Sequence, residues 1–163
     1  MRRISAIVGL LVVGASMMAY SQESSSIEGA WRITETISTG ENASSNKTPQ
    51  PGLFLFTKKH YSVVSVGGTA PRPDLGAPAD PAKLTDAEKL ARYEVWDAFS
   101  ANAGTYSVSG NTVTLSAMVA KNPAVMARPG TPREFKIEGN TMTLTQKSAD
   151  GKRETRTVLT RAE

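Results

Sequence analysis

Apolar and polar residues alternate in short stretches along most of this 163-residue chain. Alternation with a period of two is typical of β-strands that bury one face. It predicts eight strands, at residues 28–38, 52–58, 60–66, 103–109, 112–119, 133–138, 141–147 and 153–161. Pairs of turn residues also predict hairpins, because two-residue turns need positive φ angles. These pairs are Gly110-Asn111, Gly139-Asn140 and Asp150-Gly151.

One helix interrupts the strands, between the third and the fourth. Thr85 and Glu88 have the spacing of a capping box, which starts a helix. A broad apolar stripe that includes Trp96 predicts that the helix continues to about residue 100. We expect it to pack across one end of the sheet. The Pro-rich segment before it leaves two roles open, a movable lid over a barrel mouth or a permanent cap.

Eight mostly antiparallel strands in so short a chain favour either a sandwich or a closed barrel. Closure removes exposed strand edges, and hairpin connections favour an up-and-down order. The predicted fold is therefore all-β, an eight-stranded antiparallel up-and-down β-barrel with one short α-helix between strands 3 and 4. Eight strands enclose an interior that side chains fill, or that holds one small ligand.

The first 21 residues have the features of a signal peptide. Arg2 and Arg3 form a positive start, and the apolar run 4–18 is too short for a membrane-spanning helix. Small residues precede the expected cleavage site before Gln22. Residues 22–163 then form a single barrel domain. The sequence predicts export to the periplasm or the exterior, with no stable membrane anchor.

Composition excludes several classes of function. Without Arg2 and Arg3, 17 basic residues stand against 15 acidic ones, and the basic residues are scattered, so we expect no nucleic-acid partner. His60 is the only histidine and there is no cysteine, which argues against a metal site and a Cys- or His-dependent catalytic centre. We therefore expect no catalytic residues, metal or cofactor.

Gly29-Ala30-Trp31, at the start of the first predicted strand, resembles the G-x-W motif of the lipocalins. The resemblance implies that Trp31 plugs the closed end of the barrel and that Arg161, at the end of the last strand, lies over it. A guanidinium on an indole ring is a favourable pair. In this interpretation Gly29, Trp31 and Arg161 have a structural role.

The wider pattern is similar to that of bacterial lipocalin-like domain proteins and covers nearly all of residues 27–161. It includes the segments "EGAWRITE", "PGLFLFTKKHYSVV" and "REFKIEGNTMTLT". The middle lipocalin motif, an Asp-Tyr pair, is absent. The helix also precedes most of the strands instead of following the last. Both departures point to the bacterial group and not to the vertebrate transporters.

Glu35 is the most informative candidate for a site. By alternation it shares the inward face of Trp31, and a buried carboxylate needs a partner. It is expected to anchor a ligand, to pair with an inward cation or to lie at a wet barrel mouth. The residues predicted to line a ligand site are Glu35, Tyr61, Tyr106, Phe135, Leu144 and Trp96.

The sequence favours a non-enzymatic function, the binding of a small and largely apolar molecule in the barrel. The expected partner is a small hydrophobic or amphipathic ligand. One alternative is an isomerase or cyclase with Glu35 and Tyr61 as an acid–base pair. Another is a barrel filled by side chains that serves as a structural or protein-interaction module. The oligomeric state is not defined by the sequence.

Overall fold

The computed structural model describes residues 26–163, and the predicted signal peptide at residues 1–21 lies outside the described residues. The described chain forms nine strands and three helical segments. The strands are β1 (Gly29–Gly40), β2 (Ser44–Asn46), β3 (Gly52–Phe56), β4 (His60–Val66), β5 (Phe99–Ser109), β6 (Thr112–Ala120), β7 (Thr131–Glu138), β8 (Thr141–Lys147) and β9 (Arg153–Arg161). The helical segments are η1 (Pro81–Lys83), α1 (Asp86–Asp97) and α2 (Pro123–Met126).

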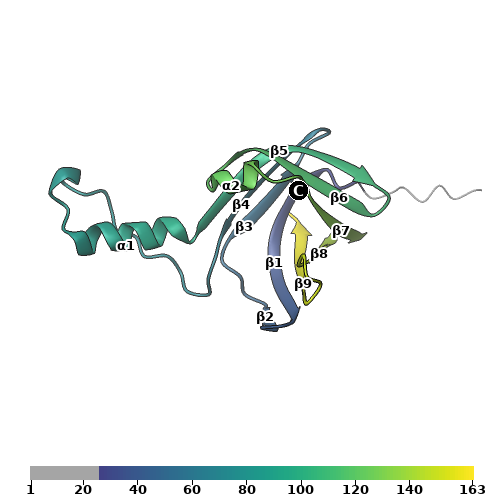
Figure 1. Cartoon of the computed structure of the whole chain (residues 1–163), viewed down its shortest axis with the longest axis horizontal. Coiled ribbons are helices and arrows are strands. Elements are labelled where there is room, and N and C mark those ends of the chain that lie inside the picture. Colours follow the sequence, from purple (N-terminus) through teal and green to yellow (C-terminus); the bar gives the residue numbers. More distant parts are fainter. Residues whose placement is uncertain (1–25) are drawn as a thin grey trace, which may run out of the picture.

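The strands follow one another around a closed barrel (Figure 1). Each strand from β3 to β9 pairs antiparallel with the next, and β1 pairs with both β3 and β9. Strand β2 pairs only with residues 36–38 of β1 and takes no part in closure. Closure pairs the two edges that an open sheet would expose. The predicted eight-stranded antiparallel up-and-down barrel is confirmed.

The position of the helix differs from the prediction. Helix α1 follows β4, not the third strand, because the short strand β2 precedes β3. With three residues, β2 is too short to show an alternating pattern. The helix also ends at Asp97 instead of at about residue 100, because β5 already begins at Phe99.

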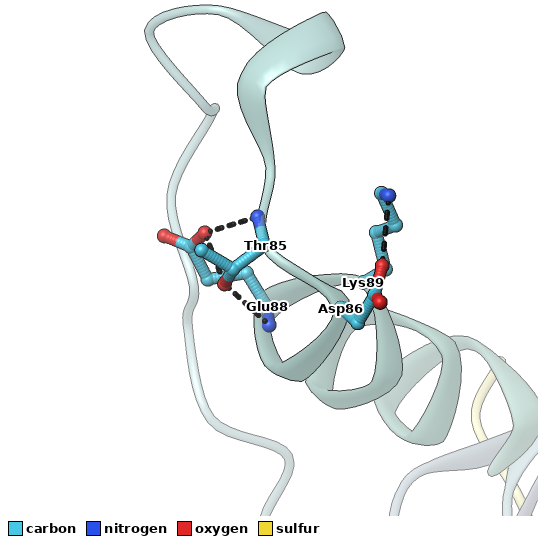
Figure 2. Close-up of polar contacts among 4 residues, drawn as sticks. All are labelled: Thr85, Asp86, Glu88 and Lys89. Atoms are coloured by element: carbon cyan, nitrogen blue, oxygen red, sulfur yellow. Dashed lines mark hydrogen bonds and ion pairs between the residues drawn. The ribbon is translucent and has the colours of Figure 1, made fainter.

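The capping box predicted at the start of α1 is present (Figure 2). The hydroxyl of Thr85 accepts a hydrogen bond from the backbone N–H of Glu88 at 3.3 Å, and the Glu88 carboxylate accepts one from the backbone N–H of Thr85 at 2.8 Å. Asp86 and Lys89 form an ion pair at 3.0 Å on the same turn. These contacts begin the helix locally, without help from the barrel.

Helix α1 projects away from the barrel and does not pack across its end (Figure 1). Its apolar side chains Leu90, Tyr93 and Trp96 are 57%, 59% and 57% exposed. The helix is tied to the barrel at its C-terminal end, where Lys121 Nζ donates to the carbonyl oxygens of Trp96 and Asp97. The prediction that it covers the sheet is therefore wrong.

The two ends of the barrel are built differently. At the closed end lie the three short turns between β3 and β4, β5 and β6, and β7 and β8, together with the segment before β1. At the open end lie the longer connections that carry β2, α1 and α2. Aromatic and aliphatic side chains fill the closed end. This core consists of Ile27, Trp31, Phe54, Phe56, Tyr61, Val113, Leu115, Met142, Leu144 and Leu159.

Trp31 and Arg161 lie together in the closed end. Trp31 is completely buried, and its indole N–H donates to the carbonyl oxygen of Ile27 at 2.8 Å. The guanidinium carbon of Arg161 lies 4.1 Å from the centre of the indole ring. Arg161 also donates to the carbonyl oxygens of Glu28 at 2.8 Å and Ser26 at 3.1 Å. It thus fixes the segment that enters β1.

The geometry of this contact explains the glycine of the G-x-W motif. Gly29 has a φ of +125°, which residues with a side chain rarely adopt. A Cβ atom at this position would also lie 2.6 Å from Nη1 of Arg161. Both the backbone and the guanidinium therefore require a residue without a side chain.

We expect Arg161→Ala to lower the free energy of unfolding by about 2 kcal/mol, because it removes a cation–π contact and two charge-assisted hydrogen bonds. Urea unfolding followed by Trp fluorescence measures this loss. The control is Arg156→Ala, since Arg156 pairs with Glu154 at 2.8 Å and its side chain is half exposed. An exposed pair of this kind contributes less than about 1 kcal/mol. Equal losses in the two variants would contradict the prediction.

We expect the first turn of α1 to fray as the pH falls below the ordinary Glu88 pKa of 4.5. Hydrogen bonds from the Thr85 hydroxyl and backbone lower the pKa of the Glu88 carboxyl. The stabilisation is therefore complete above the pKa of the unfolded chain and is lost as the pH falls through the lower pKa of the folded chain. Carboxyl NMR titration and amide exchange at residues 86–89 measure both effects. Glu88→Gln removes the titrating group, and a fraying curve unchanged in this variant would refute the assignment.

Candidate functional site

Glu35 lies on the outer face of the barrel, so the predicted inward orientation is wrong. The register between β1 and β9 shifts between Ile33 and Glu35, which makes Thr34 an extra residue in β1. Before this bulge Ile33 pairs with the buried Leu159, and after it Glu35 pairs with the outward-facing Val158. A single inserted residue reverses the alternation of every position that follows it. The carboxylate of Glu35 accepts a weak hydrogen bond from Ser45 at 3.4 Å.

The bulge brings small polar side chains to the inner wall of the open half. Thr36 pairs with Thr157, which in turn pairs with the buried Leu144, so all three share the inner face. Gln146 and Thr155 pair on the same face. The four polar residues are partly exposed although they face the interior. The inner wall of the open half is therefore less covered than the packed core of the closed end.

Arg133 is a cationic residue on the inner face of β7. It pairs with the completely buried Val113, and the inward-facing Phe135 is two residues further along. Its Nε atom is buried with no hydrogen-bond partner, and none of the ion pairs within residues 26–163 includes it. Burial lowers the pKa of the Arg133 guanidinium, and interaction with Tyr61 opposes this shift.

Tyr61 and Asn102 form a polar pair beside the apolar core. The ring of Tyr61 is buried in that core, and its hydroxyl donates to the side-chain oxygen of Asn102 at 2.7 Å. Asn102 pairs with Val63 on the inner face. Desolvation raises the pKa of the Tyr61 phenol above 10.0, while the nearby charge of Arg133 lowers it. The phenol, amide and guanidinium thus belong to one interior region.

The other predicted lining residues fall in three places. Phe135 and Leu144 lie on the inner wall, as part of or against the core. Tyr106 packs edge-on against Phe56, and its hydroxyl donates to the carbonyl oxygen of Thr57 at 2.6 Å, in a turn of the closed end. Trp96 lies outside the barrel on α1, and the centre of its ring is 5.2 Å from Nζ of Lys121. Its predicted position at the site is wrong, because the helix projects from the barrel.

The acid–base pair of the enzymatic alternative is not assembled. Glu35 faces outward and Tyr61 faces inward, so the wall of the barrel separates them. Among residues 26–163, no group of three or more His, Cys, Asp or Glu side chains is placed to hold a metal ion. In the same part of the chain, no helix has the length and apolar character needed to cross a membrane.

A separate apolar groove of about 430 Å³ lies on the outside of the barrel. Leu53 and Val64 pair with each other and contribute to its floor. Arg32 and Arg72 lie at its margins, and the Arg72 guanidinium is 5.5 Å from the centre of the Phe99 ring. The groove combines apolar surface with two cations. It is therefore an alternative to the barrel interior as a candidate site for an anionic amphiphile.

Two solved structures are similar to this chain. A lipocalin-like protein from Bacteroides uniformis is 12% identical, with a TM-score of 0.46 over 82% of this chain and 96% of that one. An uncharacterized protein from Bacteroides eggerthii is 9% identical, with a TM-score of 0.45 over 82% of this chain and 98% of that one. No protein-family model and no curated protein matches the chain. Similarity at these TM-scores carries no argument, and the eight-stranded antiparallel barrel is established by the strand pairing of the chain itself.

We expect Arg133→Met to raise the pKa of the Tyr61 phenol further. The charge of Arg133 favours the phenolate, so its removal leaves desolvation unopposed. NMR of ring-labelled tyrosine measures this pKa, with the Tyr61 signal identified by its absence in Tyr61→Phe. Arg32→Met, on the outer face of β1, serves as the matched control and leaves the pKa unchanged. An unaltered Tyr61 pKa in Arg133→Met would show that the two groups do not interact.

Proposed function

We propose that the protein binds a small molecule in the open half of its barrel. The observation that carries this proposal is the contrast between the two halves of the interior. Large apolar side chains fill the closed end, whereas residues of the inner wall in the open half are small, polar and partly exposed. Such a wall leaves room for a ligand and offers it hydrogen-bonding groups.

The inner wall favours a ligand with a substantial polar part. Thr36, Thr157, Gln146 and Asn102 supply hydroxyl and amide groups, and Arg133 supplies a charge. A largely apolar molecule would strip these groups of water without replacing their hydrogen bonds, which is unfavourable. The proposed ligand is therefore polar or amphipathic, with any apolar part against the side chains of Phe135 and the core.

The filled-barrel alternative applies to the closed end only. There Trp31, Phe54 and Met142 are almost completely buried and leave the interior packed. A purely structural barrel would need comparable packing along its whole length. The enzymatic alternative loses its predicted pair, since Glu35 faces outward. Binding without catalysis remains the function that the arrangement supports best.

Export is part of the proposal. It rests on the sequence of residues 1–21, with Arg2 and Arg3 followed by an apolar run and small residues. An exported binding protein would meet its ligand in the periplasm or outside the cell. Fractionation of cells that produce the full chain, with the N-terminal residue of the mature protein determined, tests both the compartment and the cleavage before Gln22.

We expect Thr157→Trp to abolish ligand binding, because an indole on the inner wall occupies the space of the ligand. Thr145→Trp is the matched control, since Thr145 pairs with the outward-facing Arg156 and its indole would lie outside. Native mass spectrometry after incubation with lipid or soluble-metabolite extracts measures retained small molecules. Wild-type protein and Thr145→Trp should retain the same extra mass, and Thr157→Trp should not. Retention by the wild-type protein and both variants would place the ligand outside the barrel.

A further inference from the structure

We infer that the open half of the barrel binds a carboxylate, with the Arg133 guanidinium as its anchor. This inference rests on the proposed function and specifies the chemical class of the ligand. It is carried by an inward-facing cation that has no ion-pair partner among residues 26–163 and a buried Nε atom without a hydrogen bond.

An unpaired cation inside a barrel is unfavourable for the folded state. Moving a charge out of water is expensive unless an opposite charge and hydrogen bonds replace the lost solvation. Inward-facing acidic residues would provide this compensation, but Glu35, the predicted inward carboxylate, faces outward. A ligand anion is the complementary partner that the described chain does not supply.

The groups near Arg133 suit a carboxylate. A guanidinium presents parallel N–H donors that match the two oxygens of a carboxylate. The hydroxyl of Tyr61 donates to the side-chain oxygen of Asn102, which leaves the amide N–H groups of Asn102 free to donate to a ligand. The interior thus combines one charge with directional donors, as sites for small polar ligands do.

A single cation favours a monoanion over a phosphate dianion. The other arginines in inward register on β9 are Arg161 and Arg153. Arg161 is engaged with Trp31 at the closed end, and Arg153 is exposed at the rim, where β9 begins. Arg133 is therefore the cation that faces the middle of the interior. One positive charge balances one carboxylate.

The experiment compares carboxylates with uncharged molecules of the same shape. Calorimetric titration measures the affinity of octanoate against 1-octanol and of gluconate against sorbitol, for wild-type protein and two variants. Arg133→Met removes the charge and keeps most of the side-chain volume, while Arg32→Met removes a cation from the outer groove. We expect at least one carboxylate to bind wild-type protein tenfold or more tightly than its uncharged partner. Arg133→Met should abolish that preference, and Arg32→Met should retain it.

The outcomes separate this inference from the proposed function. The carboxylate anchor is overturned if each carboxylate and its uncharged analogue bind with equal affinity and Arg133→Met changes neither. That result leaves the barrel as a binding site. Loss of the preference in Arg32→Met instead places the anion in the outer groove and overturns the inference. If no probe binds wild-type protein and no extract leaves a retained mass, both the proposed function and this inference fail.

Thermal unfolding supplies a readout that does not depend on a ligand. We expect Arg133→Met to raise the unfolding midpoint of the ligand-free protein, since it removes an inward-facing charge whose buried Nε atom has no hydrogen-bond partner. Arg32→Met should leave the midpoint unchanged, because Arg32 is exposed. A lower midpoint for Arg133→Met would show that the guanidinium stabilises the fold, and it would overturn its assignment as a ligand anchor.

Discussion

The pairing of β1 with β9 holds the barrel closed, and it extends from Trp31 to Gly40 along almost the whole of β1. The strand pairing at the other edge of β1 is less uniform. Strand β3 pairs only with residues 29–32, and beyond the bulge at Thr34 the partner is the short strand β2. Strand β1 therefore belongs to the regular barrel at the closed end and departs from β3 towards the open end. The difference between the two halves begins with this change of partner.

The interior follows the same division. Where β1 and β3 pair, their inward residues Trp31, Phe54 and Phe56 meet in a packed layer, and Arg161 covers the indole from outside. Beyond the bulge, the inward residues of β1 and β9 are Thr36 and Thr157. Large apolar side chains exclude water and stabilise the closed end. The small hydroxyl side chains of the other half are partly exposed, so one sheet has both a packed base and a more open inner wall.

The regular alternation of the sequence was sufficient to predict eight strands, the barrel and the inward positions of Tyr61, Phe135 and Leu144. It failed at Glu35 because a bulge reverses the faces, and no feature of the sequence around Thr34 distinguishes an inserted residue from a paired one. The apolar stripe of α1 showed that the helix has an apolar face but not whether anything covers it. Arg133 was within reach, since the alternation that places Phe135 and Ile137 inside also places Arg133 inside.

In the proposed function, stability and binding are assigned to different residues of one small barrel, Trp31 and Arg133. The buried indole has its N–H satisfied and a cation stacked on its ring, so both its polar group and the face of its ring have a partner. The Nε atom of Arg133, in the middle of the interior, is buried and lacks such a partner within residues 26–163. A site that is to bind an anion must keep its cation available, and the free energy lost by that arrangement has to be offset elsewhere. In the proposed function, the packed layer around Trp31 offsets this loss, because Trp31 stabilises the closed end and is not part of the proposed anion site.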